Sequence, residues 1–375
     1  MLPLAALRRP TPRPTAAAAT ESTFGRTGRA TLGVIRVHKL LVGGALVPLL
    51  LAIVPSLAAV GPVAAAASAP DQGLPAWAHV SVATVWIHPT SPRPLDEPAL
   101  TDPARIATWL SSMTVVGRLG LHGRIDTQML YGRKVIILSQ SGKWSDVEIP
   151  SQTGNHFPNG VIGWVPSAQL NSVAAPNAHR AVVVTTPSAW LLSAPDGVIG
   201  KRLLLLSYAT ELPELKEVDG YALVGLPGGG EGAIAEKAVS PMDKAPVPGG
   251  AIVAQARLFL GLPYLWGGTS GFGYDCSGLV YSVYARFGIM LPRNAADQKR
   301  ATTPILLSRA RPGDLLFFAG PHGSGEVVHV AIYAGEGLMV DAPYTGGVIE
   351  EIPMRSSPEW PDFAGVGRVQ ALSLG

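Results

Sequence analysis

Short apolar runs alternate with polar turns between residues 78 and 170 of this chain. A run of four to eight apolar or β-branched residues bounded by turn residues is typical of a strand. The strands predicted in this way span 80–87, 134–139, 144–149 and 161–165. Residues 103–113 follow Asp102 and place Ile106, Trp109 and Leu110 on one helical face. We therefore predict a small β-barrel with a helical insertion, capped at Asp102.

Residues 176–241 repeat the same pattern more compactly. Four apolar runs, AVVVTT, KRLLLLSYA, YALVGLP and EGAIAEKAV, are again separated by turn residues. Two consecutive segments of this kind predict two small barrels in tandem. The Pro-Gly-rich stretch 246–250 that follows is a plausible linker into a domain of different composition.

The third segment changes from strands to helices. Residues 251–260 have helical spacing, and after a glycine-rich loop a second helical pattern opens at Cys276 and ends before Gly288. Strand-like runs follow, namely DLLFFAG, EVVHVAIYAG, LMVDAP and GVGRVQALS. Helices first and an antiparallel sheet afterwards indicate an α+β domain.

The N-terminal 68 residues have the order of an export signal. Basic residues ending at Lys39 precede the apolar run 40–60, and an alanine-rich stretch at 64–67 supplies an A-x-A cleavage pattern. An uncleaved membrane anchor is the alternative, because the run approaches the roughly 20 residues that span a bilayer. The predicted division is therefore a leader with export signal (1–68), a first barrel (69–172), a second barrel (173–245) and an α+β domain (246–375).

The charge distribution removes one class of partner. The sequence has a net charge of +3, but seven of its 29 basic residues and only one of its 26 acidic residues precede residue 69. The remainder carries a small net negative charge, so the basic balance belongs to the leader. We expect no nucleic-acid partner.

The chain contains a single cysteine, Cys276, at the predicted start of a helix. One thiol cannot form an internal disulfide, even in an oxidising compartment. The unpaired N–H groups and the dipole of a helix N-terminus stabilise a thiolate, and the same groups can hold an oxyanion. A buried small hydrophobic residue is the alternative role for a lone cysteine. The polar neighbours Asp275 and Ser277 argue against burial and favour a reactive thiol.

A thiol nucleophile needs a base, and His329 lies within a predicted strand. The next predicted strand contains Asp341 and is joined to the first by the short turn 335–337. Such strands pair antiparallel, so an acid on one can reach an imidazole on the other and fix its tautomer. A structural histidine and a turn aspartate are the alternatives.

Five ordered blocks in residues 249–375 carry a family resemblance. They are YLWGG from Tyr264, DCSGLV from Asp275, LPR from Leu291 with Gln298, PGDLLFF from Pro312, and HVAIY from His329. Together they resemble the NlpC-type cysteine peptidases of the bacterial envelope. The resemblance implies a papain-like fold and hydrolysis of peptidoglycan stem peptides between γ-D-glutamate and a diamino acid, without a cofactor.

The resemblance also assigns residue roles. Cys276 matches the nucleophile, His329 the general base, and Asp341 the third polar position. Tyr264 matches a tyrosine whose hydroxyl assists the oxyanion hole, while Asp275 and Ser277 match residues that line the substrate site. An acid at position 341 should hold a protonated imidazole more firmly than a histidine would, which favours a thiolate–imidazolium pair.

The first barrel resembles a narrower subgroup. Segments 82–86, 91–93, 109–110 and above all TQMLYG at 127–132 look like the first SH3-like domain of enzymes that trim released stem peptides with a free N-terminal L-alanine. Two positions depart from that pattern: Arg133 stands where an acid commonly follows LYG, and Ile162 where a tyrosine often precedes glycine-tryptophan. Asp96, Glu97 and Asp126 are the candidate substitutes for the missing acid.

Other functions remain as alternatives. A zinc enzyme would have to use His322 and His329, but no H-E-x-x-H or paired-cysteine spacing is present. An inert wall-binding protein, a hydrolase of intact peptidoglycan, and an acyltransferase that releases a thioester to an amine keep the same fold. The prediction is an exported, cofactor-free cysteine endopeptidase of two SH3-like barrels and a papain-like domain. Its partners are stem peptides or muropeptides, and its contact with a membrane is only through an uncleaved leader.

Overall fold

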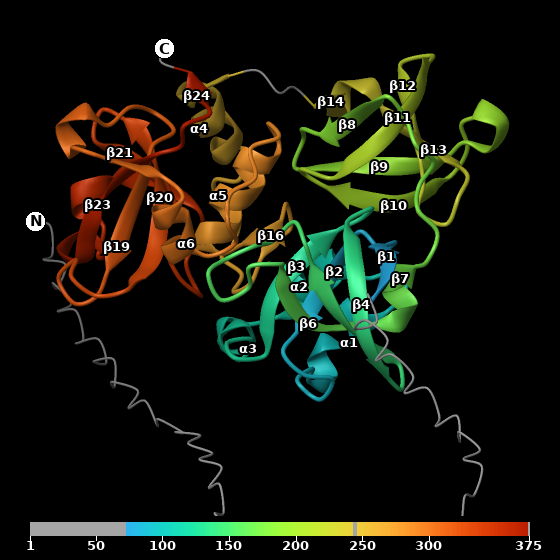
Figure 1. Ribbon diagram of the computed structural model, residues 1–375, viewed down its shortest axis with the longest axis horizontal. Helices are drawn as coiled ribbons and strands as arrows, with labels where there is room; N and C mark the ends of the chain where they lie inside the picture. The colour runs from blue at the N-terminus through green and yellow to red at the C-terminus, as the bar shows by residue number, and fades with distance from the viewer. Residues whose placement is uncertain (1–72, 243–245, 374–375) are drawn as a thin grey trace, which may run out of the picture. The chain divides into compact units, whose positions relative to one another are not determined.

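The structure is a computed structural model that describes residues 73–242 and 246–373 (Figure 1). The predicted leader and export signal lie outside the described residues. Within the described ranges, no helix is both long and apolar enough to cross a membrane.

The first part of the chain forms a seven-stranded antiparallel sheet in the order β3-β2-β6-β5-β4-β1-β7. Its strands are β1 (Leu74–Ala78), β2 (Val82–Trp86), β3 (Ile125–Leu130), β4 (Lys134–Ser141), β5 (Trp144–Ile149), β6 (Val161–Pro166) and β7 (Leu170–Asn171). Four of these coincide with the predicted strands to within two residues at each end. Alternate side chains of β5 are buried, as expected for a strand with one face toward a core.

A second seven-stranded sheet follows with the order β10-β9-β13-β12-β11-β8-β14. Its strands are β8 (Arg180–Val184), β9 (Ser188–Ser193), β10 (Arg202–Ser207), β11 (Glu211–Val218), β12 (Tyr221–Gly225), β13 (Glu231–Ala235) and β14 (Val239–Pro241). Counted from its own first strand, this order is the same as that of the first sheet. The prediction of two barrels of one kind in tandem is confirmed by this shared topology.

The helical insertion lies between β2 and β3 and contains α1 (Glu97–Leu100), α2 (Ile106–Ser112) and α3 (Val115–Leu119). Ile106, Trp109 and Leu110 are buried as predicted. The predicted start of the helix is wrong. The residue before α2 is Arg105, which makes no side-chain cap, while the Asp102 carboxylate lies 3.4 Å from His79 Nε2.

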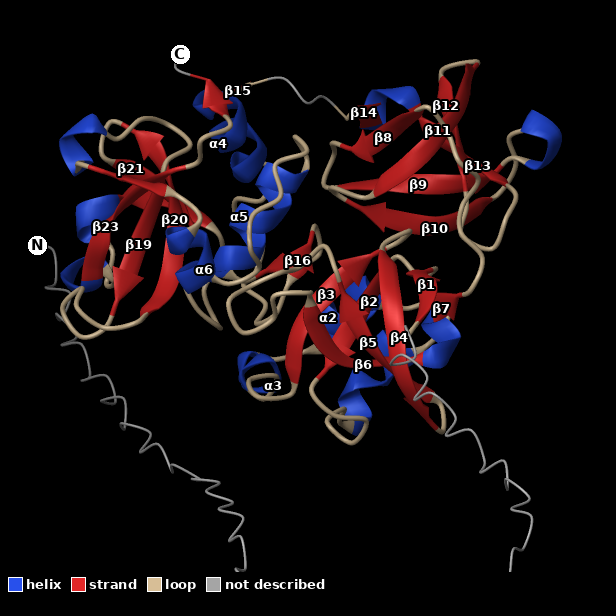
Figure 2. Cartoon of the chain, in the orientation of Figure 1, coloured by secondary structure: helices blue, strands red, loops and turns tan. Residues whose placement is uncertain are grey.

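The third part begins with helices and ends in a sheet, which confirms the α+β prediction. Its helices are α4 (Gly249–Arg257), α5 (Cys276–Ala285) and α6 (Ala295–Arg300). Its six-stranded antiparallel sheet has the order β18-β23-β19-β20-β21-β22. These strands are β18 (Thr303–Ile305), β19 (Leu315–Ala319), β20 (Val327–Gly335), β21 (Leu338–Asp341), β22 (Glu350–Pro353) and β23 (Phe363–Arg368). Figure 2 shows the helices α4 to α6 beside this sheet.

Two small strand pairs complete the third part. The hairpin β16 (Thr269–Ser270) and β17 (Gly273–Tyr274) leads directly into α5. The strands β15 (Val247–Pro248) and β24 (Leu372–Ser373) pair in parallel, so the beginning and the end of this part lie together. Helix α5 is buried along its whole length, because it packs between β20, β16 and α4.

One apolar core continues from the first sheet into the third part. Trp86, Trp109 and Ile125 belong to the same cluster of buried side chains as Phe259 and Leu279. Burial of apolar area is the main favourable contribution to folding, so the two parts share a stabilising core at this point.

Candidate active site

Cys276 is the first residue of α5, as the sequence predicted. Asp275 precedes it in an extended conformation and caps the helix, because its side chain accepts a hydrogen bond of 2.6 Å from the Gly278 amide. The N–H groups in the first turn of a helix have no intrahelical acceptor. They and the helix dipole can therefore stabilise an oxyanion beside Cys276.

The close approach of the backbone at Gly268 explains why residue 278, at the end of the DCSG segment, is a glycine. A Cβ built on Gly278 would lie 1.9 Å from the carbonyl oxygen of Gly268. That same oxygen accepts a hydrogen bond of 3.2 Å from the Asp275 amide. The helix start is thus held directly against the glycine-rich loop, which fixes the position of Cys276.

His329 and Asp341 meet across the hairpin of β20 and β21. His329 Nε2 lies 2.7 Å from Asp341 Oδ1, and both side chains are buried. The strands pair antiparallel, as the short turn at 335–337 predicted. With Nε2 engaged by the carboxylate, Nδ1 is the ring nitrogen left for the thiol of Cys276.

The charge state of His329 follows from these neighbours. Burial alone would lower the pKa of the imidazole, but attraction to Asp341 and to Cys276, with hydrogen bonds to both, holds the pKa well above its usual value. These neighbours therefore favour the protonated form of the imidazole. A protonated imidazole beside a thiolate is the resting ion pair of a cysteine nucleophile.

Tyr264 lies close to this group. Burial raises the pKa of its phenol well above the usual value, and the charges of Cys276 and Asp275 raise it further. Its backbone N–H donates to Gly347 O at 3.1 Å, which ties it to the loop after Asp341. A phenol that keeps its proton is available as a hydrogen-bond donor to a developing oxyanion.

Asp275 and Ser277 are buried, so the prediction that they keep Cys276 out of a buried setting is wrong. Cys276 itself is 8% exposed. Both Asp275 oxygens accept hydrogen bonds from the guanidinium of Arg293, at 3.1 and 2.6 Å, and Arg293 Nη1 also donates to Ser277 Oγ at 3.0 Å. Polar residues can be buried when they are paired with each other, and the sequence pattern does not distinguish this case from exposure.

Arg293 is the residue that the sequence reasoning missed. It is 2% exposed, and although burial disfavours its charge, Asp275 and Cys276 raise the pKa of its guanidinium. It stands in the LPR block, which the resemblance uses without giving the arginine a role. The sequence signal that could have identified Arg293 is a charged residue that directly follows the apolar pair Leu291 and Pro292.

The acids considered for amine recognition in the first sheet have different surroundings. Asp96 is fully buried and is bound by Arg93 and by Trp109 Nε1, so it is structural. Glu97 is exposed and lies 2.8 Å from Arg105 Nη2. Asp126 is exposed, and its backbone adjoins Gly267 of the catalytic loop. Although the residue is exposed, protein atoms crowded around its carboxylate raise the pKa of Asp126, and the charge of nearby Arg293 opposes that rise.

The two departures from the subgroup pattern also have places in the structure. Arg133 lines a cavity of about 1190 Å³ together with Tyr131 and residues 174–181 that connect the two sheets. None of the predicted catalytic residues lines that cavity. Ile162 is 40% exposed on β6, next to Gly163, whose Cβ position lies 3.8 Å from Asp126 Oδ2. Arg133 thus belongs to another surface, while the residue next to Ile162, Gly163, lies beside Asp126.

The turn between α3 and β3 contacts the loops around the catalytic residues through His122. Its ring lies against Trp266, with centroids 4.2 Å apart and planes inclined by 34°. Its Nε2 lies 3.0 Å from Thr345 Oγ1, in the loop after Asp341. One side chain from the turn before β3 therefore touches both the loop after Tyr264 and the loop after Asp341.

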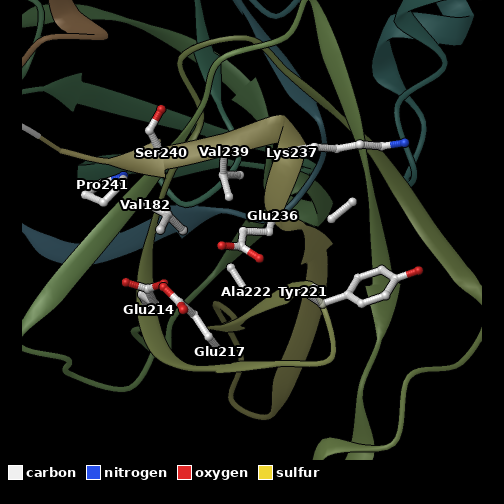
Figure 3. Close-up of a pocket in the computed structure, with 12 residues that line it drawn as sticks. Val182, Glu214, Glu217, Tyr221, Ala222, Glu236, Lys237, Val239, Ser240 and Pro241 are labelled. Carbon is white, nitrogen blue, oxygen red and sulfur yellow. The ribbon is translucent and has the colours of Figure 1, made fainter.

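A further cavity of about 620 Å³ lies in the second sheet (Figure 3). Glu214, Glu217 and Glu236 line it, and Figure 3 shows Lys237 extending away from these carboxylates. It contains none of the predicted catalytic residues, so we do not place the active site there. Across residues 73–242 and 246–373, no group of three His, Cys, Asp or Glu side chains could hold a metal ion. His322, the second histidine of the zinc alternative, lies in a left-handed turn with φ 53°.

Comparison with known proteins agrees with this arrangement. The sequence profile of the NlpC/P60 family matches residues 261–367, and that of the YKFC SH3b2 domain matches residues 184–240. The chain is 39% identical to a gamma-D-glutamyl-L-lysine dipeptidyl-peptidase of Bacillus subtilis, over 72% of this chain and 90% of that protein. It is 35% identical to the Bacillus cereus protein of the same name, over 78% and 90%.

A solved structure extends the likeness to the fold. An NlpC/P60 family protein from Bacillus cereus superimposes with a TM-score of 0.74 at 34% identity, covering 79% of this chain and 99% of that one. The likeness therefore includes both SH3-like sheets as well as the part that carries Cys276.

Proposed function

Because this chain belongs to the NlpC/P60 family of cysteine peptidases, we propose that it hydrolyses γ-D-glutamyl–diamino acid bonds in peptidoglycan stem peptides. The observation that carries the proposal is the buried His329–Asp341 pair next to the one cysteine of the chain, at a helix N-terminus. The two relatives named for this activity match the chain over nine-tenths of their own length.

The proposed reaction has two steps that share one intermediate. The Cys276 thiolate attacks the γ-carbonyl carbon of D-glutamate, and the carbonyl oxygen becomes an oxyanion next to the first-turn N–H groups of α5 and the Tyr264 hydroxyl. The imidazolium of His329 gives its proton to the amine of the diamino acid as the C–N bond breaks. A thioester on Cys276 and a free amine result.

Water then completes the reaction. Neutral His329 takes a proton from a water molecule, whose oxygen attacks the thioester carbon. The C–S bond breaks, the γ-carboxylic acid of D-glutamate is released, and the thiolate–imidazolium pair forms again. Asp341 holds the ring in one orientation and stabilises its charged form in both steps.

We propose that the substrate is a short released peptide with a free N-terminal L-alanine, and that Asp126 pairs with its amine. Of the three acids considered, Asp126 is the one that adjoins the catalytic loop and is not bound in a short ion pair. An exposed carboxylate at that place can attract an ammonium group, whereas Arg133 faces another cavity.

The predicted cellular place follows from the same proposal. Peptidoglycan lies outside the cytoplasmic membrane, and the charged, apolar and alanine-rich order of residues 1–68 is that of an export signal. We therefore propose that the protein acts outside the cytoplasm, on stem peptides or muropeptides.

The test is cleavage of L-Ala-γ-D-Glu-meso-diaminopimelate beside its N-acetylated form, followed by mass spectrometry, with the wild-type protein and Cys276→Ala. Cleavage of the free-amine peptide alone, lost in the variant, is the expected result. Equal cleavage of both forms would contradict amine recognition and favour intact peptidoglycan as substrate. No cleavage of either form, with the lysine peptide also intact, would overturn the proposed hydrolysis and favour a wall-binding protein.

A further inference from the structure

A buried chain of hydrogen bonds connects the first sheet to the residue that caps the catalytic helix. Arg293, which binds both oxygens of Asp275, also donates from Nε to Thr127 Oγ1 on β3 at 2.8 Å. Thr127 Oγ1 donates in turn to Gln152 Oε1 at 2.6 Å. Thr127 and Gln152 are at most 2% exposed, so these bonds lie out of contact with water.

The same network reaches the other side of the loop before α5. Gln152 Nε2 donates to the backbone oxygen of Gln128 at 2.7 Å, and that oxygen also accepts from Thr269 Oγ1 at 2.9 Å. The Gln128 side-chain oxygen accepts from Ser270 Oγ at 3.0 Å. Thr269 and Ser270 form β16, so the hairpin in front of Cys276 and the cap of its helix are both held by the first sheet.

The charges of Asp275 and Arg293 affect how readily the Cys276 thiol ionises. An unneutralised Asp275 carboxylate beside Cys276 would oppose a thiolate, because like charges repel strongly where water is excluded. Arg293 neutralises this carboxylate and also attracts the negative charge on Cys276. The guanidinium can do both only while its plane is fixed, and its Nε bond to Thr127 fixes it.

We propose that Arg293 and Thr127 are positioning residues through which the first SH3-like sheet sets the reactivity of Cys276. The proposal rests on the proposed function of Cys276 as nucleophile. Neither residue is assigned a contact with substrate: Thr127 acts through Arg293, and Arg293 acts through Asp275. The first sheet is then part of the catalytic apparatus, in addition to any part it has in substrate recognition.

The sharpest variant is Thr127→Val, which keeps the side-chain shape and removes the hydroxyl. It leaves Arg293 Nε and Gln152 Oε1 without this partner in a buried setting. Thr127→Ser restores the hydroxyl and serves as the conservative rescue. Ser145→Ala is the matched control, because Ser145 is also fully buried in the first sheet, but its hydroxyl bonds to Gln140 of β4 and to Ser167 of the short helix after β6.

Two readouts separate reactivity from hydrolysis. Because the chain has one cysteine, the rate of alkylation by iodoacetamide reports Cys276 alone. It is measured against pH on the whole exported protein, beside kcat and KM for the free-amine peptide and the thermal midpoint of each variant. The charged and polar groups around the thiol are His329 and Asp341 on the strands, Tyr264, Asp275 and Arg293 around the helix start, and Asp126 on β3.

For Thr127→Val we expect alkylation at neutral pH and kcat to fall together by roughly tenfold, the effect of losing one hydrogen bond to a charged group. Its alkylation profile should move to higher pH, because the Asp275 carboxylate beside the thiol is then less well neutralised. Thr127→Ser should be close to wild type, and Ser145→Ala should lower the thermal midpoint without changing either rate.

Unchanged alkylation in folded Thr127→Val would overturn the proposal. If Thr127→Val does not fold, Arg293→Lys provides the same comparison, because lysine keeps the charge but cannot bond to Thr127, Asp275 and Ser277 at once. An alkylation rate equal to that of the wild type in Arg293→Lys would also overturn the proposal. If the wild type alkylates rapidly and the variants slowly while no peptide is cleaved, the positioning role stands and the proposed hydrolysis fails.

Discussion

His329 and Asp341 are joined by a 2.7 Å hydrogen bond between neighbouring strands, and the aspartate keeps its second oxygen, Oδ2, without a hydrogen-bond partner among the described residues. The carboxylate thus contributes its charge mainly to the imidazole. A carboxylate at this position favours the imidazolium more than a neutral side chain would.

Replacing Asp341 by asparagine should narrow the pH range of activity. The raised pKa of His329 keeps the imidazole protonated as pH rises, and loss of the carboxylate charge lowers that pKa. The basic limb of the kcat/KM profile should therefore move to lower pH, and kcat/KM at neutral pH should fall by roughly tenfold or more. Peptide hydrolysis across a pH series measures both effects; an unmoved basic limb would contradict the assigned ion pair.

The same pair predicts a pH-dependent stability. Because the pKa of His329 is higher in the folded state than in the unfolded chain, its stabilisation is complete below the unfolded value and is lost as pH rises through the folded value. The thermal midpoint of the wild type should exceed that of Asp341→Asn in neutral buffer, and the difference should shrink in strongly alkaline buffer. If the thermal midpoints of the two proteins differed by the same amount in neutral and in alkaline buffer, the proton would not be held on His329 by Asp341.

Replacing Cys276 by alanine should abolish hydrolysis and leave the fold unchanged. The side chain is small and 8% exposed, so its truncation removes little packing. Mass spectrometry should find one alkylated thiol in the wild type and none in the variant. Residual cleavage by the folded variant at more than a trace would mean that another group carries the reaction.

Replacing Asp126 by asparagine should raise KM for the free-amine peptide by roughly twofold to fivefold, the effect of one partly exposed charge pair, with little change in kcat. The N-acetylated peptide, which lacks the ammonium group, should show no such rise. Glu97→Gln is the matched control, since Glu97 is an exposed acid of the same sheet already paired with Arg105. An equal effect of both variants would remove Asp126 from amine recognition.

Replacing Gly278 by alanine should destabilise the protein by roughly 1–3 kcal/mol and displace the nucleophile, because the added methyl group would overlap the carbonyl oxygen of Gly268. Gly250→Ala is the control: it lies in α4 with no atom within 4 Å of the added Cβ. That variant should be stabilised by about 0.5–1 kcal/mol, since alanine loses less backbone entropy in a helix. Denaturant unfolding measures both changes.

Short sequence patterns predicted most of the helices, strands and hairpins, because these depend on residues close together in the chain. The helix start at Cys276 and the pairing of His329 with Asp341 both follow from short segments, in which turn residues and alternation set the geometry. The shared topology of the two sheets followed from the repeated pattern of apolar runs. The predicted cap at Asp102 failed: α2 begins only at Ile106, and the Asp102 carboxylate lies beside His79, which is distant in sequence.

The polar network could not be predicted in the same way. Thr127 and Arg293 are 166 residues apart, and no periodicity connects a β-strand of one domain to a loop of another. A buried arginine bound to an aspartate and a threonine looks the same in sequence as three exposed polar residues. Only the packing of the two parts against one core brings these side chains together.

The parallel pairing of β15 with β24 means that the chain enters and leaves the catalytic part at one place. A domain whose two ends lie together can be joined to different neighbouring domains without a change in its own fold. Recombination can therefore move the domain as one unit. Its Arg293 would then arrive without Thr127. In a new protein, another hydrogen-bond acceptor would have to replace the Thr127 hydroxyl beside the guanidinium of Arg293. Each such protein would therefore have to evolve its own contact that positions Arg293 next to Asp275.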